Sequence, residues 1–119
     1  MYKRQGFVLN IHNKTGKNLE VDWNRTFYIH NGEINGGFLF PDMRAGDRDK
    51  PKPPDIISAD SLLTKEIFPG KLAQFSSIAM ATIFEAMKPG ENGVSLTVKI
   101  DGKEMTEKLT MHLTQQQSK

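Results

Sequence analysis

The residues best suited to contact a ligand gather in one proline-rich stretch between Pro41 and Pro54. Its aspartates could supply the hard oxygen ligands of calcium, but calcium loops place such groups at fixed offsets with few competing cations. Here basic side chains alternate with the acidic ones and would repel a divalent ion. The sequence therefore predicts a solvated, salt-paired loop that serves as a binding surface. The candidate binding residues are Asp42, Arg44, Asp47, Arg48, Asp49, Lys50 and Lys52.

The histidines are the other candidates for a metal site, and the chain has three, His12, His30 and His112. No two of them have the His-x-His or His-x-x-x-His spacing that brings two imidazoles onto one metal. Each lies in a strand-like segment at the parity opposite the apolar residues, which predicts a solvent-facing side chain. The chain also lacks cysteine, which excludes disulfides, thiolate metal sites and a cysteine nucleophile. We predict no metal site.

Nucleophilic catalysis needs an activated hydroxyl, and the sequence contains no motif for one. The serines lie outside any Gly-x-Ser-x-Gly elbow, and Gly36-Gly37 matches neither a dinucleotide-binding nor a Walker pattern. Paired carboxylates that meet only in the folded chain could hydrolyse a substrate, so a hydrolase or metal-dependent enzyme is a minor alternative. We predict a non-enzymatic protein with no catalytic residue and no cofactor.

Charge and length narrow the class of protein further. The 16 basic and 14 acidic residues are interspersed and leave a net charge of +2, which predicts no nucleic-acid partner. No apolar run approaches the ~20 residues of a membrane helix, and none follows the basic start to form a signal peptide. We predict one domain over residues 1–114 and a flexible polar tail at 115–119.

Residues 19–32 alternate apolar with polar types and hold the only tryptophan. A period of two over this length predicts a half-buried strand, or two strands joined by a kink at Asn24-Arg25. Trp23 shares its parity with Val21, so we predict that its indole anchors the core. The alternative is an outward aromatic patch, formed with Tyr28, that binds a ligand.

The segments on either side of this stretch also have strand patterns. Phe7–His12 alternates in the same way and is followed by turn-forming residues at 13–18, which predicts an antiparallel hairpin with Leu19–Trp23. Residues 34–40 form a further candidate strand, in which Gly36-Gly37 indicates a bulge.

The C-terminal part has the clearest pattern. Val94–Ile100 alternates, Asp101-Gly102 is a preferred type I′ turn pair, and Lys103–Leu113 forms the return strand. The return strand has four apolar residues predicted to face inward, Met105, Leu109, Met111 and Leu113. Apolar residues at helical spacing before Pro89 predict a short helix or helical turn over 79–87.

Together these elements predict an all-β fold, an antiparallel immunoglobulin-like β-sandwich of about seven to eight strands with at most one short helix at 79–87. The runs Phe7–Thr15 and Leu19–Asn24, and the proline-rich run before Asp55, resemble small β-sandwich domains of uncharacterised bacterial envelope lipoproteins. The opening is also similar to β-sandwich modules of the late-embryogenesis-abundant type. The first resemblance implies a periplasmic or envelope location, although the sequence lacks the signal and lipobox cysteine of such lipoproteins.

The leading hypothesis is therefore a non-enzymatic module of a bacterial envelope protein with a binding or assembly role, whose contact surface is the loop at 41–54. Its partner would be a protein or another envelope component. The alternative is a β-strand-addition partner, in which an exposed edge at 34–40 or 6–12 pairs with another chain.

Overall fold

The computed structural model describes residues 5–41, 43, 47, 49–76, 78 and 81–113. These residues form eleven strands, β1 to β11, and two short 3₁₀ turns, η1 (Trp23–Arg25) and η3 (Gly70–Leu72). All the strand pairs are antiparallel. The prediction of an antiparallel all-β fold is thus confirmed. The described residues include no helix of the length and apolarity needed to cross a membrane.

The smaller of the two facing sheets, which we call sheet A, has three strands. Their order is β1 (Phe7–His12), β7 (Leu62–Pro69) and β5 (Phe38–Leu39), so β7 is the central strand and β1 is an edge. β1 pairs with β7 over its whole length, from Phe7 opposite Ile67 to His12 opposite Leu62.

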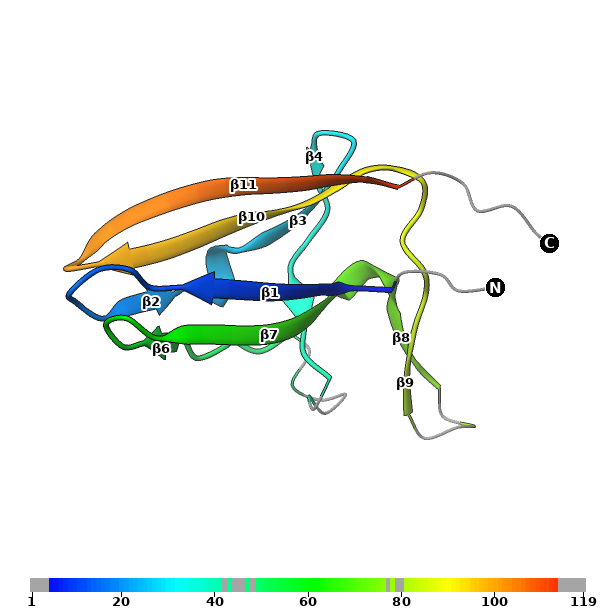
Figure 1. The fold of residues 1–119 in the computed structure, drawn as a ribbon. Helices are drawn as coiled ribbons and strands as arrows, with labels where there is room; N and C mark the ends of the chain where they lie inside the picture. The colour runs from blue at the N-terminus through cyan, green and yellow to red at the C-terminus, as the bar shows by residue number, and fades with distance from the viewer. Residues whose placement is uncertain are drawn as a thin grey trace.

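The larger sheet, sheet B, is built on β10 (Gly90–Ile100). One edge of β10 pairs along its full length with β11 (Lys103–Leu113). The other edge pairs first with β3 (Phe27–His30) and then with β2 (Leu19–Val21). Beyond these strands lie β4 (Glu33–Ile34) and β6 (Asp55–Ile57). Figure 1 shows the long β10–β11 hairpin on one side of the molecule and β7 with β6 on the other.

The core lies between the two sheets. Phe7 of β1 has its ring centroid 6.4 Å from that of Tyr28 on β3 and 6.0 Å from that of Phe38 on β5. Val94 and Leu96 of β10 are buried in the same cluster. Sheet A therefore covers sheet B as far as β10.

The predicted hairpin between Phe7–His12 and Leu19–Trp23 is wrong. β1 pairs with β7 in sheet A, whereas β2 pairs with β10 and β6 in sheet B. The turn between β1 and β2 crosses from one sheet to the other around Asn13, whose amide donates to the carbonyl oxygens of Lys17 and Ile57. Because this side chain satisfies backbone groups of the turn from within, the two neighbouring strands can separate instead of pairing.

The predicted helix at 79–87 is also wrong. Ala81–Phe84 forms β9, which pairs with β8 (Ala73–Ser76) in a hairpin that Figure 1 shows beside the sandwich. Residues 79 and 80 lie outside the described part of the chain. The β-branched Thr82 and Ile83 favour a strand, and β8 supplies a hydrogen-bonded neighbour, whereas so short a helix would be marginal on its own.

Residues 19–32 form two strands joined by a kink, as one of the predicted arrangements had it. The kink is η1, where the side chain of Asp22 accepts a hydrogen bond from the backbone N–H of Asn24 at 3.1 Å. The candidate strand at 34–40 divides at Gly36, whose φ is +80°, into β4 of sheet B and β5 of sheet A. A positive φ at this point turns the chain from one sheet toward the other.

The C-terminal hairpin has the predicted register and turn. Ile100 lies opposite Lys103, and φ is +53° at Asp101 and +75° at Gly102, as a type I′ turn requires.

Gly93 on β10 occupies a position where a side chain has no room. A Cβ atom there would lie 2.4 Å from the carbonyl oxygen of Leu109 on β11. We expect Gly93→Ala to lower the free energy of unfolding by about 2–3 kcal/mol, because the two backbones must move apart. Gly16→Ala, whose Cβ would meet nothing within 4 Å, should change it by less than about 0.5 kcal/mol. Equal denaturation midpoints for the two variants would contradict this close approach.

Candidate functional site

The proline-rich loop contributes to a surface depression. Of the seven predicted binding residues, Asp42, Arg44 and Arg48 lie outside the described residues. Asp47 belongs to the loop but does not line the depression. We call this hollow the loop depression. Its volume is about 570 Å³, and it is lined by Trp23, Asn24, Phe27, Gly37, Asp49, Lys50, Pro51 and Lys52. The structure thus brings three of the predicted residues together against η1 and β3.

Hydrogen bonds fix the loop on η1. The side-chain amide of Asn24 donates to the carbonyl oxygen of Lys52 at 2.8 Å and accepts from its backbone N–H at 2.7 Å. Lys50 forms an ion pair with Asp47 at 3.4 Å, so the salt-paired character predicted for the loop is found at this pair. Because such exposed pairs contribute little to stability, these charges remain available to a partner.

Beneath the loop, Trp23 anchors the core as predicted, with 3% of its surface exposed. Its indole N–H donates to the Asp55 carboxylate at 2.7 Å. The ammonium of Lys65 lies 3.2 Å from the same carboxylate oxygen and 4.2 Å from the ring centroid of Phe40. This partly buried group links η1 to β6 and β7. Within the described part of the chain, no buried side-chain nitrogen or oxygen lacks a hydrogen-bond partner.

The alternative of an outward aromatic patch is wrong, because Tyr28 is buried as well. Its hydroxyl donates to the side-chain oxygen of Asn92, and burial raises the pKa of Tyr28 above its ordinary value. His30 stacks on this ring and contacts the carbonyl oxygen of Pro89 at 3.1 Å. His12 is exposed at the end of β1. Within the described ranges, no three acidic or histidine side chains are grouped so that they could hold a metal ion.

A second surface arises because β11 extends sheet B beyond sheet A. In the β10–β11 register, Met105 lies opposite Val98 and Leu109 lies opposite Val94. Paired residues point to the same face of a sheet, so both β11 residues are on the inner, core-facing side. Among the β11 residues whose side chains are described, those on this side are Lys103, Met105, Glu107, Leu109 and Met111.

The inner side of β11 has little cover. Val94 of β10 is 1% exposed, but Leu109 beside it is 40% exposed and Met105 is 52% exposed. Met105 and Leu109 therefore point to the inner side of the sheet, as predicted. They are not buried, however, because the cover that buries β10 does not extend over β11. We call this surface the open step: the inner side of β11 from Lys103 to Met111, bordered by the edge of β1. Among the described strands, only β7 pairs with β1 and only β10 with β11.

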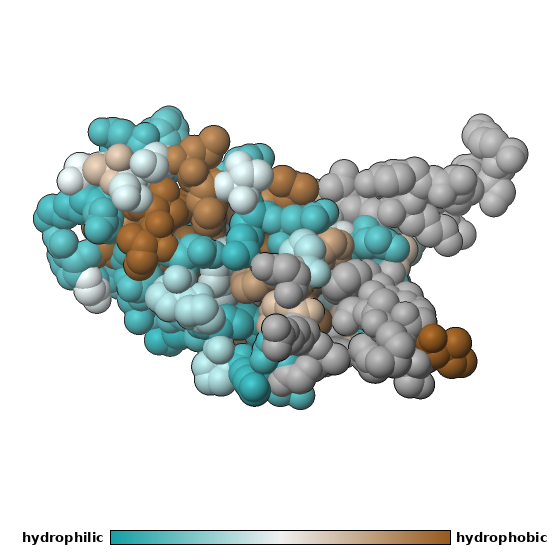
Figure 2. Space-filling view, turned by 90° about the horizontal axis from the view of Figure 1, so that it is seen from below, coloured by the Kyte–Doolittle hydropathy of each residue, from teal (hydrophilic) through white to brown (hydrophobic). Residues whose placement is uncertain are grey.

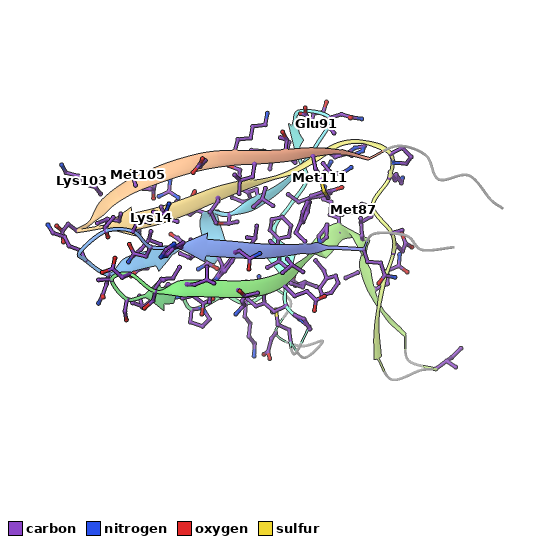
Figure 3. The ribbon with its side chains drawn as sticks, in the orientation of Figure 1. Lys14, Met87, Glu91, Lys103, Met105 and Met111 are labelled. Carbon is purple, nitrogen blue, oxygen red and sulfur yellow. The ribbon has the colours of Figure 1, made fainter. Side chains whose placement is uncertain are left out.

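The open step runs along the length of the sandwich. Figure 3 shows Lys103 and Met105 of β11, with Lys14 from the turn after β1, toward the end that holds the β10–β11 turn. Met111 and Met87 lie toward the other end. Met111 packs against the core cluster that contains Met87, so the step closes there. Its uncovered apolar part is centred on Met105 and Leu109.

Two further exposed apolar residues, Ile34 and Ile56, lie away from the open step, whereas the exposed Val8 is on β1, which borders it. Ile34 is on β4 and Ile56 is on β6, strands separated from β11 by two others in sheet B. Figure 2 shows that apolar side chains also gather on the face seen from below. β4 and β6 have two and three residues, so they offer a shorter edge than the six residues of β1.

Comparison with protein-family models, with curated proteins and with solved structures found no match. The protein is therefore classed by its own geometry, as an antiparallel all-β protein in which two sheets enclose one core. The immunoglobulin-like strand order expected from the sequence stays a prediction. The loop depression and the open step are its two candidate sites.

Proposed function

We propose that this protein is a non-enzymatic interaction module that accepts one extended strand from another protein chain at the open step. The observation that carries the proposal is the exposure of Met105 and Leu109 on the core-facing side of β11. A strand added to the edge of β1 would lie directly over them. The added strand would extend sheet A and cover the last strand of sheet B.

Strand addition uses two kinds of contact. Backbone hydrogen bonds to the edge of β1 supply affinity, and side chains at alternate positions supply specificity. Covering Met105 and Leu109 buries their apolar surface, which stabilises the complex by on the order of 1–2 kcal/mol for each side chain. The backbone edge and the apolar surface lie side by side, so a single segment can use both.

The width of the open step favours a single strand over a second copy of this chain. The buried Val94 shows that β10 lies beneath sheet A, so β11 projects by one strand. If β1 paired with β1 of a second copy, that copy's β10 would fall where β11 already lies. Neighbouring strands are about 4.8 Å apart, which leaves room for one.

The loop depression is a second candidate contact surface, supported by its volume and by the exposed charges of Asp49 and Lys50. It could hold a flanking part of the same partner.

The resemblance to envelope lipoprotein domains supports a setting in the bacterial cell envelope, where such modules meet other envelope proteins. Fractionation of cells that express the native gene would test that setting.

A display library of extended peptides with alternating apolar positions tests the proposed function. We expect the enriched peptides to bind the purified protein and to protect the amide hydrogens of β1 from exchange. The double variant Met105→Thr/Leu109→Thr should weaken this binding at least tenfold, because the apolar contact is lost. Fluorescence anisotropy with a labelled peptide measures the affinity.

The double variant Ile34→Thr/Ile56→Thr is the matched control, since it removes two still more exposed apolar residues from strands remote from β11. Its affinity for the peptide should stay within about twofold of the parent's. Equal losses in both double variants would show only nonspecific apolar binding. Binding that depends instead on Lys50 and Lys52 would place the site at the loop depression.

A further inference from the structure

Charged residues alternate with apolar ones along the open step. Their order predicts the sequence of the strand that would bind there under the proposed function. Lys103 and Glu107 lie on the inner side of β11, on either side of Met105. Four residues of strand span about 13 Å, so these two charges are too far apart to pair with each other. Neither has an ion-pair partner among the described residues.

A second cation strengthens the charge at one end. Lys14, in the turn that follows β1, is exposed and likewise has no ion pair within the described part of the chain. Figure 3 places Lys14 and Lys103 at the same end of the sandwich, one from each side of the open step. The neighbouring Lys17 differs, because Asp101 already pairs with it. This end of the open step is therefore positive.

The directions of β1 and β11 determine the order in which a bound strand meets these residues. Figure 1 shows β1 running toward the β10–β11 turn and β11 running away from it. A strand antiparallel to β1 thus runs in the same direction as β11. Read from its N-terminus, it meets Lys103, Met105, Glu107 and Leu109 in that order, at every second residue.

We propose that the partner strand adds antiparallel to β1 and carries, at alternate positions, an acidic, an apolar, a basic and an apolar residue. This inference rests on the proposed function. The acidic residue pairs with Lys103 and Lys14, and the basic residue pairs with Glu107. The apolar residues cover Met105 and Leu109. A strand with the charges exchanged would place like charges together. A strand in the opposite orientation would place its charges over Met105 and Leu109 or, shifted by two residues, over like charges, and each arrangement disfavours binding.

Two synthetic peptides as long as β11 test this pattern. Both have threonine at the outward positions and leucine at the two apolar positions; one has glutamate first and lysine second, and the other has them exchanged. We expect the glutamate-first peptide to bind the parent protein about tenfold more tightly at low salt, with the difference shrinking as salt screens the pairs. Fluorescence anisotropy measures both affinities.

The variant Lys103→Glu/Glu107→Lys provides the decisive comparison, because it exchanges the two charges of the protein and should reverse the preference between the peptides. Both residues are exposed, and an unchanged thermal midpoint would confirm that the fold is retained.

The charge pattern would be overturned if parent and variant each bound both peptides equally. The proposed function would still stand in that case, provided that Met105→Thr/Leu109→Thr still weakened binding. Tighter binding of the lysine-first peptide to the parent would overturn the antiparallel orientation. If neither peptide binds and no library peptide protects β1, the proposed function itself fails.

Discussion

Replacing Trp23 by alanine is expected to lower the free energy of unfolding by about 4 kcal/mol. Loss of a buried aromatic ring removes its apolar burial and leaves a cavity. Trp23 is buried against Phe40, with ring centroids 5.2 Å apart. The substitution also removes the indole N–H from which the Asp55 carboxylate accepts a hydrogen bond. Among the described side chains, only Lys65 would then contact this partly buried carboxylate. Denaturant unfolding followed by circular dichroism measures the change.

Trp23→Phe separates the two contributions. It retains much of the apolar contact with Phe40 but removes the hydrogen bond to Asp55, and we expect a loss of about 1–2 kcal/mol. Trp23 also lines the loop depression, so both variants should loosen the loop at residues 49–52, which faster amide exchange there would report. A loss below about 1 kcal/mol for Trp23→Ala would mean that the ring does not anchor the core.

Asn13→Ala is expected to lower the free energy of unfolding by about 3 kcal/mol. The residue is 1% exposed, and its amide nitrogen donates to three backbone carbonyl oxygens, those of Lys17, Ile57 and Ser58, at 2.7, 2.8 and 3.1 Å. Its side-chain oxygen accepts from the backbone N–H and the hydroxyl of Thr15. Alanine would leave several of these buried groups without partners, each with a desolvation penalty of about 1 kcal/mol or more.

Asn10→Ala is the matched control for this prediction. Asn10 is exposed on β1, and its side-chain oxygen accepts one hydrogen bond, from the hydroxyl of Thr64 at 2.8 Å. Its removal should change the free energy of unfolding by less than about 0.5 kcal/mol. If the two asparagine variants were equally stable, the turn between β1 and β2 could not depend on the Asn13 amide.

The structural role of Asn13 could not be predicted from the sequence. Asparagine in a turn is common and ordinarily indicates exposure, because its side chain can bond to the local backbone. Here the same side chain reaches Ile57 and Ser58, about 45 residues away in the chain. Local pattern cannot reveal an acceptor so distant, and the error in pairing β1 with β2 has the same origin.

The candidate site was predicted in part. The proline-rich composition correctly located a loop, and Asp49, Lys50 and Lys52 do line a depression. The partner side of that depression, η1 and Gly37, was not predicted, because it comes from other segments of the chain. The edge at 6–12 was named as an alternative site for strand addition, and β1 is indeed an edge strand. The role of β11 in forming the open step was missed, since its apolar residues were expected to be covered.

The sequence by itself determined the features that depend on neighbours along the chain. Asp101-Gly102 required a tight turn because both residues adopt positive φ, and alternation on either side then set the register of β10 and β11. The alternation of residues 19–23 also predicted a buried Trp23 ring, and the ring is buried although Trp23 begins η1. These are local properties of backbone conformation and side-chain direction.

Only the tertiary structure decided which strands became neighbours and where cover ends. Alternation shows that Met105 and Leu109 point inward, but whether another layer lies over them depends on the number and order of strands in sheet A. Pairing between β1 and β7 joins residues 50 to 60 positions apart, and many strands of similar pattern could compete for that edge. The open step exists because sheet A ends at β1 while sheet B continues to β11.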